Sequence, residues 1–223
     1  LMASMRKMRM NIPLSFTLEF FSDIFLAAIA ENQIQEGVIE LLAYRNRDDG
    51  FSAKTPVHFY FEIRQKDEVL KISDKYELDL MKEISVNTNV LSNIKVHSPE
   101  NIYAEIYAKE NDLDDVIFLN PNKKIARTIY GNLLLLEENT IKIPKQTEGA
   151  YISPLMENFV TFVHKNNLAT IEEAELSAFE SQKAEEILVI SDEKGIFTVS
   201  KIRNKEFGNE RYKTMLEAWK TSF

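Results

Sequence analysis

The sequence predicts a mixed fold, α+β or α/β, divided into two domains. Patterns typical of helices and of strands alternate along all 223 residues, as they do in these classes. The stretch 86–95 has little periodicity and separates two patterned parts. We therefore expect a small α+β domain over residues 1–88, a connection over 89–97 and a larger α/β domain over 98–223. Only six glycines and six prolines are present, which argues against long flexible linkers.

The first part begins with helical patterns and continues with strands. The stretch Leu14–Glu31 is rich in apolar residues and predicts an amphipathic helix with a broad buried face. Gly37–Tyr44 and Val57–Ile63 have the composition of strands, and a further strand is expected around Leu78–Ser85. Leu1 leads directly into residues that resemble the middle of a helix without an N-cap, so we expect further residues upstream.

The second part contains strong helix starts and several short strands. Ser98 can cap a helix with Pro99 at its first position, and the apolar residues of its next two turns, Ile102, Tyr103, Ile106 and Tyr107, form one stripe. Ser153 and Pro154 predict a second helix start of the same kind. The remaining expected elements are strands at 114–119, 125–129, 133–136, 140–143, 187–191 and 196–203, and a closing helix lined by Tyr212, Met215, Leu216 and Trp219.

The composition excludes several classes of function. A net charge of −8 and a pI near 5.1 argue against a nucleic-acid or anionic-membrane surface as the main partner. No cysteine is present, which excludes disulfides and thiolate chemistry and is compatible with the reducing cytoplasm where we place the protein. No segment is long and apolar enough to span a membrane.

Generic motifs for chemistry are scarce. The three histidines, His58, His97 and His164, are scattered and predict no metal site. The sequence has no glycine loop for phosphate and no nucleophile elbow. Acidic pairs such as Glu172–Glu173 are typical of solvated faces. Residue patterns alone therefore indicate no particular reaction.

A series of short segments, taken in order, carries more information. Upstream are 1–6 (LMASMR) and 91–95 (LSNIK), followed by 106–115 (IYAKENDLDD), 130–133 (YGNL), 140–144 (TIKIP), 147–149 (TEG), 184–188 (AEEIL) and 201–207 (KIRNKEF). In this order they resemble the class IV pyridoxal-phosphate-dependent aminotransferases. That group holds branched-chain and D-amino-acid aminotransferases and aminodeoxychorismate lyase.

The resemblance carries expectations about fold, cofactor and partners. It implies the two-domain scaffold of fold-type IV, like that of D-amino-acid aminotransferase, with pyridoxal 5'-phosphate as cofactor. It implies a homodimer that acts on an amino acid or keto acid. It also implies that the family's N-terminal strands are missing here, together with an arginine that stands just before Leu1 and holds the cofactor phosphate.

The resemblance also assigns site residues. Lys95 stands where the family's Schiff-base lysine stands, and it is the candidate catalytic residue. The other candidate cofactor-binding residues are Arg127, Asn132, Ser153 and Ser191.

Four departures from the family pattern bear on activity. Arg127 replaces a glutamate that keeps the pyridine nitrogen protonated, which should weaken the ring as an electron sink. Pro154 removes one N–H donor from the expected phosphate turn, and Asp192 adds a negative charge close to it. Glu40 stands on a strand where relatives often carry an arginine near the substrate.

Two hypotheses follow for function. One is an active enzyme that performs pyridoxal-phosphate-dependent transamination or aminodeoxychorismate-lyase chemistry through Lys95. The other is a catalytically degenerate relative that acts as a non-catalytic binding or structural protein, and the changes at Arg127, Pro154 and Asp192 favour it.

Overall fold

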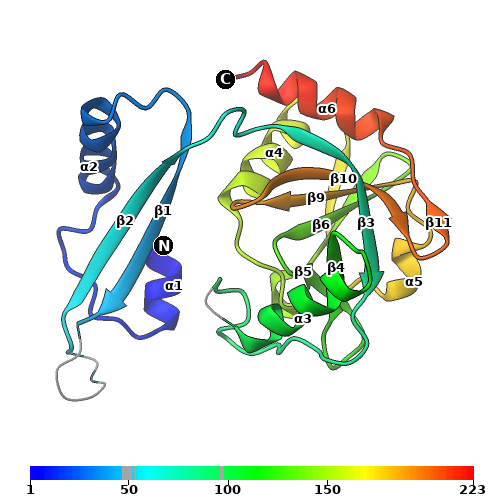
Figure 1. Ribbon diagram of the computed structural model, residues 1–223, viewed down its shortest axis with the longest axis horizontal. Helices are drawn as coiled ribbons and strands as arrows, with labels where there is room; N and C mark the ends of the chain where they lie inside the picture. Colours follow the sequence, from blue (N-terminus) through cyan, green and yellow to red (C-terminus); the bar gives the residue numbers. More distant parts are fainter. Residues whose placement is uncertain (47–51, 53, 96–97) are drawn as a thin grey trace. The chain divides into compact units, whose positions relative to one another are not determined.

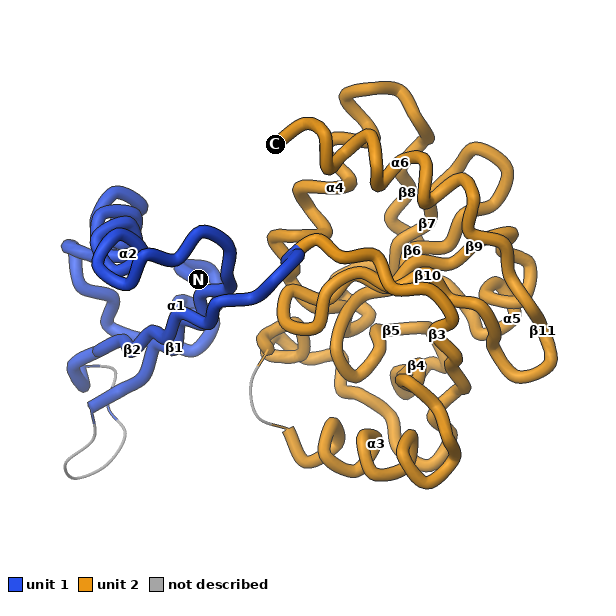
Figure 2. Tube along the Cα trace, turned by 45° about the horizontal axis from the view of Figure 1, so that its top comes forward, with its two compact units in different colours: residues 1–69 blue, residues 70–223 orange. Residues whose placement is uncertain are grey.

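The computed structural model describes residues 1–46, 52, 54–95 and 98–223. These residues form two compact units, Leu1–Val69 and Leu70–Phe223 (Figure 2). Strand β3 (Ile72–Leu80) pairs with strands of the second unit. The division therefore lies earlier in the chain than the expected limits of the domains 1–88 and 98–223.

The first unit contains two helices and one hairpin. Helices α1 (Met2–Lys7) and α2 (Leu18–Glu31) are followed by β1 (Gly37–Arg45) and β2 (Val57–Gln65), which pair antiparallel. The expected helix begins at residue 18 rather than 14, because Thr17 caps it by accepting a hydrogen bond of 3.1 Å from the N–H of Phe20.

Aromatic side chains hold the first unit together. On one face of β2, the ring of Phe59 lies 5.2 Å from that of Phe21, and Phe61 lies 5.2 Å from Phe25, in edge-to-face contacts between strand and helix. The opposite face of the hairpin leaves Leu42 and Tyr60 more than half exposed.

The second unit is built on a nine-stranded sheet that wraps around its own core (Figure 1). The strand order is β5-β4-β3-β10-β9-β6-β7-β8, with the short β11 paired to β10. The pairs β3–β10, β3–β4 and β7–β8 are parallel, and the other pairs are antiparallel. Its remaining elements are α3 (Pro99–Glu110), β4 (Asp115–Leu119), β5 (Ile125–Thr128), β6 (Asn132–Glu137), β7 (Thr140–Pro144), α4 (Pro154–Lys165), β8 (Thr170–Ala174), α5 (Ala178–Ser181), β9 (Glu186–Ser191), β10 (Gly195–Ile202), β11 (Lys205–Glu206) and α6 (Glu210–Lys220).

The central strands are buried on both faces. Along β6, Leu134 and Leu136 pack into the layer formed with α4 and α6, whereas Leu133 and Leu135 point into the opposite core. Because successive side chains of a strand alternate between faces, a strand buried on both sides must be continuously apolar. Helices α4 and α6 lie together on one face of the sheet (Figure 1), and Trp219 of α6 is fully buried there.

Helix α3 begins where the sequence predicts, with Ser98 before it and Pro99 at its first position, but it exposes most of its apolar stripe. Its buried face carries only the small residues Ala104 and Ala108, while Ile102, Tyr103 and Ile106 are 45%, 46% and 53% exposed. Of the four residues of the apolar stripe, only Tyr107 packs against the core, because the small alanines allow the helix to approach β4 and β5 closely.

Most of the other long elements were correctly predicted, whereas β8 and the short elements α5 and β11 were not expected from the sequence. The third strand runs from Ile72 to Leu80 rather than from 78 to 85. Strand β8 was missed because it is an edge strand with the exposed Glu172 and Glu173, and such strands lack the apolar alternation on which prediction depends.

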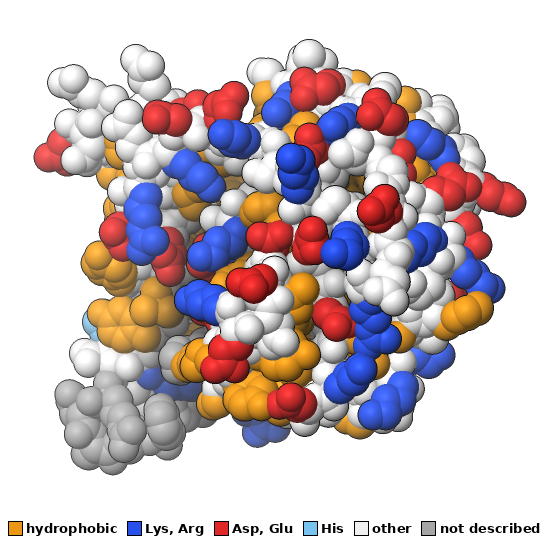
Figure 3. Space-filling model, turned by 45° about the vertical axis from the view of Figure 1, so that its right-hand side comes forward, with side chains coloured by type: hydrophobic (Ala, Val, Ile, Leu, Met, Phe, Trp, Pro, Cys, Tyr) orange, Lys and Arg blue, Asp and Glu red, His pale blue; other side chains and the backbone are white. Residues whose placement is uncertain are grey.

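On the face that Figure 3 shows, acidic and basic side chains are interspersed rather than separated by sign.

Candidate functional site

The N-terminus of α4 is the first part of the site, and a side chain of the same chain occupies it. Asp192, just after β9, accepts hydrogen bonds through Oδ1 from the hydroxyl of Ser153 (2.9 Å) and from the N–H of Leu155 (3.0 Å). The Ser153 Oγ accepts in turn from the N–H of Met156 at 3.1 Å. Pro154 has no N–H. The donors of the first helical turn are therefore used internally.

Ser191 organises the turn that carries Asp192. Its hydroxyl donates to the carbonyl of Tyr130 at 2.7 Å and accepts from the N–H groups of Glu193 (3.3 Å) and Lys194 (3.0 Å). Ser191 is only 1% exposed. This serine fixes the β9–β10 turn and so determines where the carboxylates of Asp192 and Glu193 lie.

Lys95 forms an ion pair with Glu193. The Lys95 Nζ lies 2.8 Å from Oε2 of Glu193, and the two side chains are 39% and 52% exposed. Partial burial pushes the pKa of Glu193 upward, but the hydrogen bond and charge of Lys95, together with Lys194, outweigh it and hold that pKa below its ordinary value. The pair therefore joins the end of the 86–95 stretch to the β9–β10 turn.

Arg127, on β5, is the most deeply buried charge of the candidate site. Its guanidinium lies between two rings, with Cζ 4.8 Å from the centroid of Phe118 and 4.3 Å from that of Tyr151. Nη1 donates to the carbonyl of Thr128 and Nη2 to Oδ1 of Asn101, each at 2.9 Å. Arg127 is 5% exposed, and burial lowers its pKa from the usual value. Within the described part of the chain, its Nε has no hydrogen-bond partner.

Asn132 positions the ring that covers Arg127. Its Nδ2 donates to the carbonyl of Tyr151 at 2.8 Å, and its Oδ1 accepts from the N–H of Tyr151 at 2.9 Å. Asn132 is fully buried at the start of β6. The Asn132 side-chain amide thus bonds to the backbone of Tyr151 as a neighbouring strand would. These bonds hold Tyr151 where its ring stacks on the Arg127 guanidinium.

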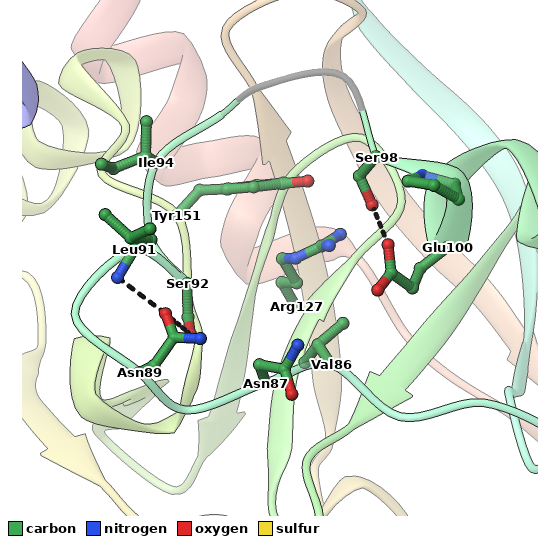
Figure 4. Close-up of a pocket in the computed structure, with 11 residues that line it drawn as sticks. Val86, Asn87, Asn89, Leu91, Ser92, Ile94, Ser98, Glu100, Arg127 and Tyr151 are labelled. Atoms are coloured by element: carbon green, nitrogen blue, oxygen red, sulfur yellow. Dashed lines mark hydrogen bonds between the residues drawn. The ribbon is translucent and has the colours of Figure 1, made fainter. Parts of the chain in front are cut away.

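A cavity of about 240 Å³ lies beside Arg127 (Figure 4). Its walls come from residues 86–94, from the start of α3, from β5 and from the segment before α4. Figure 4 shows the Arg127 side chain between Tyr151 on one side and Asn87 and Val86 on the other. Every lining residue belongs to the second unit.

The structure groups the predicted site residues into two clusters. Ser153 donates to Asp192, Ser191 accepts from the N–H of Glu193, the residue after Asp192, and Lys95 is paired with the Glu193 side chain. Arg127 and Asn132 form the other cluster and share Tyr151 as a partner.

Three members of these clusters were missed from the sequence: Glu193, Asn101 and Tyr151. For Glu193, the only available sequence signal was its position next to Asp192. No motif marks Asn101 or Tyr151.

Two negative findings apply to the described residues only. Residues 1–46, 52, 54–95 and 98–223 contain no group of three or more His, Cys, Asp or Glu side chains suited to a metal ion. In the same part of the chain, every helix is too short or too polar to cross a bilayer. His97 lies outside the described residues.

The fold is shared with solved structures of fold-type IV aminotransferases. A branched-chain aminotransferase from Thermoproteus uzoniensis superposes with a TM-score of 0.86 at 15% identity, covering 99% of this chain and 75% of that one. The PLP form of a branched-chain amino acid aminotransferase from Thermobaculum terrenum gives 0.86 at 18% identity, covering 98% and 74%. A protein assigned as a 4-amino-4-deoxychorismate lyase from Legionella pneumophila gives 0.85 at 16%, covering 99% and 82%.

Family membership comes from the sequence itself. The family model for amino-transferase class IV matches residues 1–202, so this chain belongs to that family. No curated protein matches the sequence. The prediction of the family and of the fold-type IV scaffold is confirmed.

The residues present do not fit pyridoxal phosphate, the cofactor that the family implies. A phosphate at the start of α4 requires free N–H donors, but Leu155 and Met156 already donate to Asp192 and Ser153. A phosphate dianion placed there would also meet the negative charge of Asp192. At the position implied for the pyridine nitrogen, the guanidinium of Arg127 lies packed between two rings.

Proposed function

We propose that this chain is a non-catalytic, small-molecule-binding member of the class IV aminotransferase family. One observation carries the proposal: Asp192 accepts hydrogen bonds from Ser153 and Leu155 at the start of α4. A carboxylate there supplies the anion that the helix N-terminus attracts. The N–H donor at the start of α4 is thus satisfied by a carboxylate of the same chain, and the helix does not depend on a phosphate-bearing cofactor.

The pairing of Lys95 supports the same proposal. The Lys95 Nζ donates a hydrogen bond of 2.8 Å to Glu193, so the amine is engaged within the chain instead of being free to attack an aldehyde. Arg127 acts in the same direction, because an arginine cannot keep a pyridine nitrogen protonated as a carboxylate does.

A second candidate function is pyridoxal-phosphate-dependent transamination, or aminodeoxychorismate-lyase chemistry, on an amino acid or keto acid. Lys95 favours it, since the resemblance assigns this residue to the family's lysine position and its side chain is 39% exposed. An aldehyde can therefore reach the amine once the ion pair with Glu193 opens.

The two functions differ in what pyridoxal phosphate does to the purified chain. The protein is mixed with the cofactor, reduced with borohydride and digested, and labelled lysines are mapped by mass spectrometry. Lys145 is a matched control, because it is also paired to a glutamate and its side chain is 42% exposed, close to the 39% of Lys95. We expect Lys95 to be labelled no more than Lys145. Selective label at Lys95, with a visible absorbance band, refutes the non-catalytic proposal.

The homodimer and the cytoplasmic location are further proposals. The exposed apolar residues of α3, Ile102, Tyr103 and Ile106, support association of the chain. Light scattering after size exclusion checks this, with a mass of 25.8 kDa for a single chain and twice that for a dimer. The absence of cysteine is compatible with a reducing compartment.

A further inference from the structure

Helix α2 of the first unit is apolar over most of its surface. All but four of its fourteen residues are apolar, the exceptions being Glu19, Ser22, Asp23 and Glu31. Residues 24–30 are apolar without interruption, and helix segments that are apolar all round are normally enclosed by neighbours. Among these fourteen residues, all of which the structure describes, only Phe21 is buried. The broad buried face that the sequence predicts is therefore only partly covered.

The covered part of α2 is the row of phenylalanines that packs on the hairpin. Edge-to-face contacts join Phe21 and Phe25 to aromatic rings of β2 (Figure 1). Leu18 and Leu26, by contrast, remain 79% and 63% exposed. Only Ser22 stands between them, and because residues four positions apart are neighbours on a helix, the three form one stripe along α2. Exposed apolar side chains that gather in this way, rather than singly, are typical of an interaction surface.

The charges beside this stripe are all negative. Residues 10–44 contain no lysine, arginine or histidine, whereas they contain the acidic residues Glu19, Asp23, Glu31, Glu36 and Glu40. Glu19 and Asp23 are exposed, and each follows a residue of the stripe by one position. The two are themselves four positions apart, so their carboxylates line one side of the stripe. A partner that covers the stripe must therefore bring apolar side chains and positive charge together.

We propose that α2 is the docking surface for a basic amphipathic helix of another protein. The apolar side chains of that helix cover Leu18 and Leu26, and its lysines or arginines meet Glu19 and Asp23. Packed helices lie about 8–10 Å apart, a distance over which long basic side chains reach carboxylates beside the contact. These residues belong to the first unit, whereas the candidate site is built from the second, so the inference goes beyond the proposed function and does not depend on it.

The same charges argue against two other occupants. A second copy that presents the same face would set Glu19 and Asp23 against their own equivalents, and like charges oppose association. An anionic lipid surface is disfavoured for the same reason, since the helices that bind such surfaces carry lysine and arginine on their polar face.

The probe is the synthetic peptide LKKLLKLLKKLLKL, which as a helix places leucines on one face and lysines on the other. Its binding to the full chain is followed by fluorescence anisotropy of the labelled peptide. One control peptide has glutamate in place of every lysine, and the other has the same composition with its leucines spread around the helix. We expect saturable binding of the probe and roughly tenfold weaker binding of both controls. Equal binding of either control overturns the proposal.

Substitutions on α2 test whether this helix is the surface. Leu18→Gln combined with Leu26→Gln removes the stripe, spares the phenylalanine contacts and should weaken probe binding roughly tenfold. Leu42→Gln is the matched control, because Leu42 is 58% exposed on the hairpin of the same unit, and it should leave binding unchanged. Asp23→Asn should weaken binding about threefold, whereas Asp67→Asn, at another exposed position of the first unit, should have no effect. Unchanged binding in the double variant, or an equal loss in Leu42→Gln, overturns the assignment to α2.

Two further measurements address the other occupants. Light scattering should give the same mass for the native chain and for Leu18→Gln with Leu26→Gln, and neither should sediment with vesicles of phosphatidylcholine and phosphatidylglycerol. A native dimer that becomes a monomer in the double variant overturns the proposal in favour of a second copy. Vesicle binding that the double variant loses overturns it in favour of a lipid surface.

Discussion

Asp115 gives the sharpest quantitative prediction, because it is a carboxyl enclosed by the core. It is 0% exposed at the start of β4. Its Oδ1 accepts from the N–H groups of Val116 (2.7 Å) and Ile129 (2.9 Å), and its Oδ2 accepts from the Tyr76 hydroxyl at 3.1 Å. Burial nevertheless dominates these hydrogen bonds and raises the pKa of Asp115 from 3.8 to about 6.

The raised pKa makes stability depend on pH in a defined direction. A folded-state pKa above the unfolded value means that the native state binds more protons, so the stability linked to Asp115 is complete below about pH 4 and is lost as pH rises through about 6. The shift of about two units corresponds to roughly 3 kcal/mol. Of this, about 2 kcal/mol is lost between about pH 4.5 and 7.5.

Asp115→Asn removes the titration while keeping the shape of the side chain. The amide oxygen can accept from Val116 and Ile129, and its nitrogen can donate to Tyr76. Urea unfolding across this pH range should therefore show that the variant gains about 2 kcal/mol on the native chain as pH rises. Asp67→Asn, the same change at an exposed position, controls for the loss of one negative charge. Parallel pH profiles for the native chain and Asp115→Asn would falsify the reasoning.

Three further substitutions probe the candidate site and its support. Asn132→Ala breaks both hydrogen bonds to the backbone of Tyr151 in a fully buried place and should lower the free energy of unfolding by roughly 2–4 kcal/mol in urea titrations; a loss below about 1 kcal/mol contradicts the positioning role. Gly131→Ala places a Cβ 2.3 Å from the carbonyl oxygen of Ile190, so the β6–β9 pairing must shift, and a loss of roughly 1–3 kcal/mol or more is expected in the same assay. Asp192→Ala removes the acceptor of the Leu155 N–H, so we expect a loss of about 1 kcal/mol and a new rise in melting temperature on adding inorganic phosphate; phosphate that stabilises the native chain equally contradicts the idea that Asp192 occupies the anion position.

Much of the second unit was predictable because its core elements carry strong periodic signals. Tyr212, Met215, Leu216 and Trp219 recur at helical spacing, and all four are buried in α6. Strands β6 and β9 were predicted from short continuous apolar runs, which a sheet buried on both faces requires. Helix α3 was predicted, but its apolar stripe does not mark the packed face, which is formed by Ala104 and Ala108.

The site was only partly predictable, because its decisive contacts join distant residues. Arg127, Pro154 and Asp192 could be singled out as departures from a family pattern. That Asp192 bonds to Ser153 depends on how β9 and α4 pack, and the two residues are 39 positions apart. The side-chain acceptor of Arg127 is likewise far away in sequence, since Asn101 lies 26 positions upstream.

The departures from the family pattern are better explained as one coupled change than as separate losses of cofactor contacts. A helix start with free donors and an anionic ligand is stabilised only while the ligand is bound. Asp192 supplies the negative charge permanently, so α4 is capped whether or not a ligand is present. Glu193, one residue further, pairs with Lys95.

Asp192 thus binds the start of α4 and Glu193 binds Lys95. The family pattern assigns both of these partners to the cofactor. Restoring one donor at a time should therefore recover little cofactor affinity. Asp192→Ala frees the helix start, but Lys95 stays paired and Arg127 stays between Phe118 and Tyr151. Affinity for pyridoxal phosphate that returns fully in this single variant would show that the changes are independent.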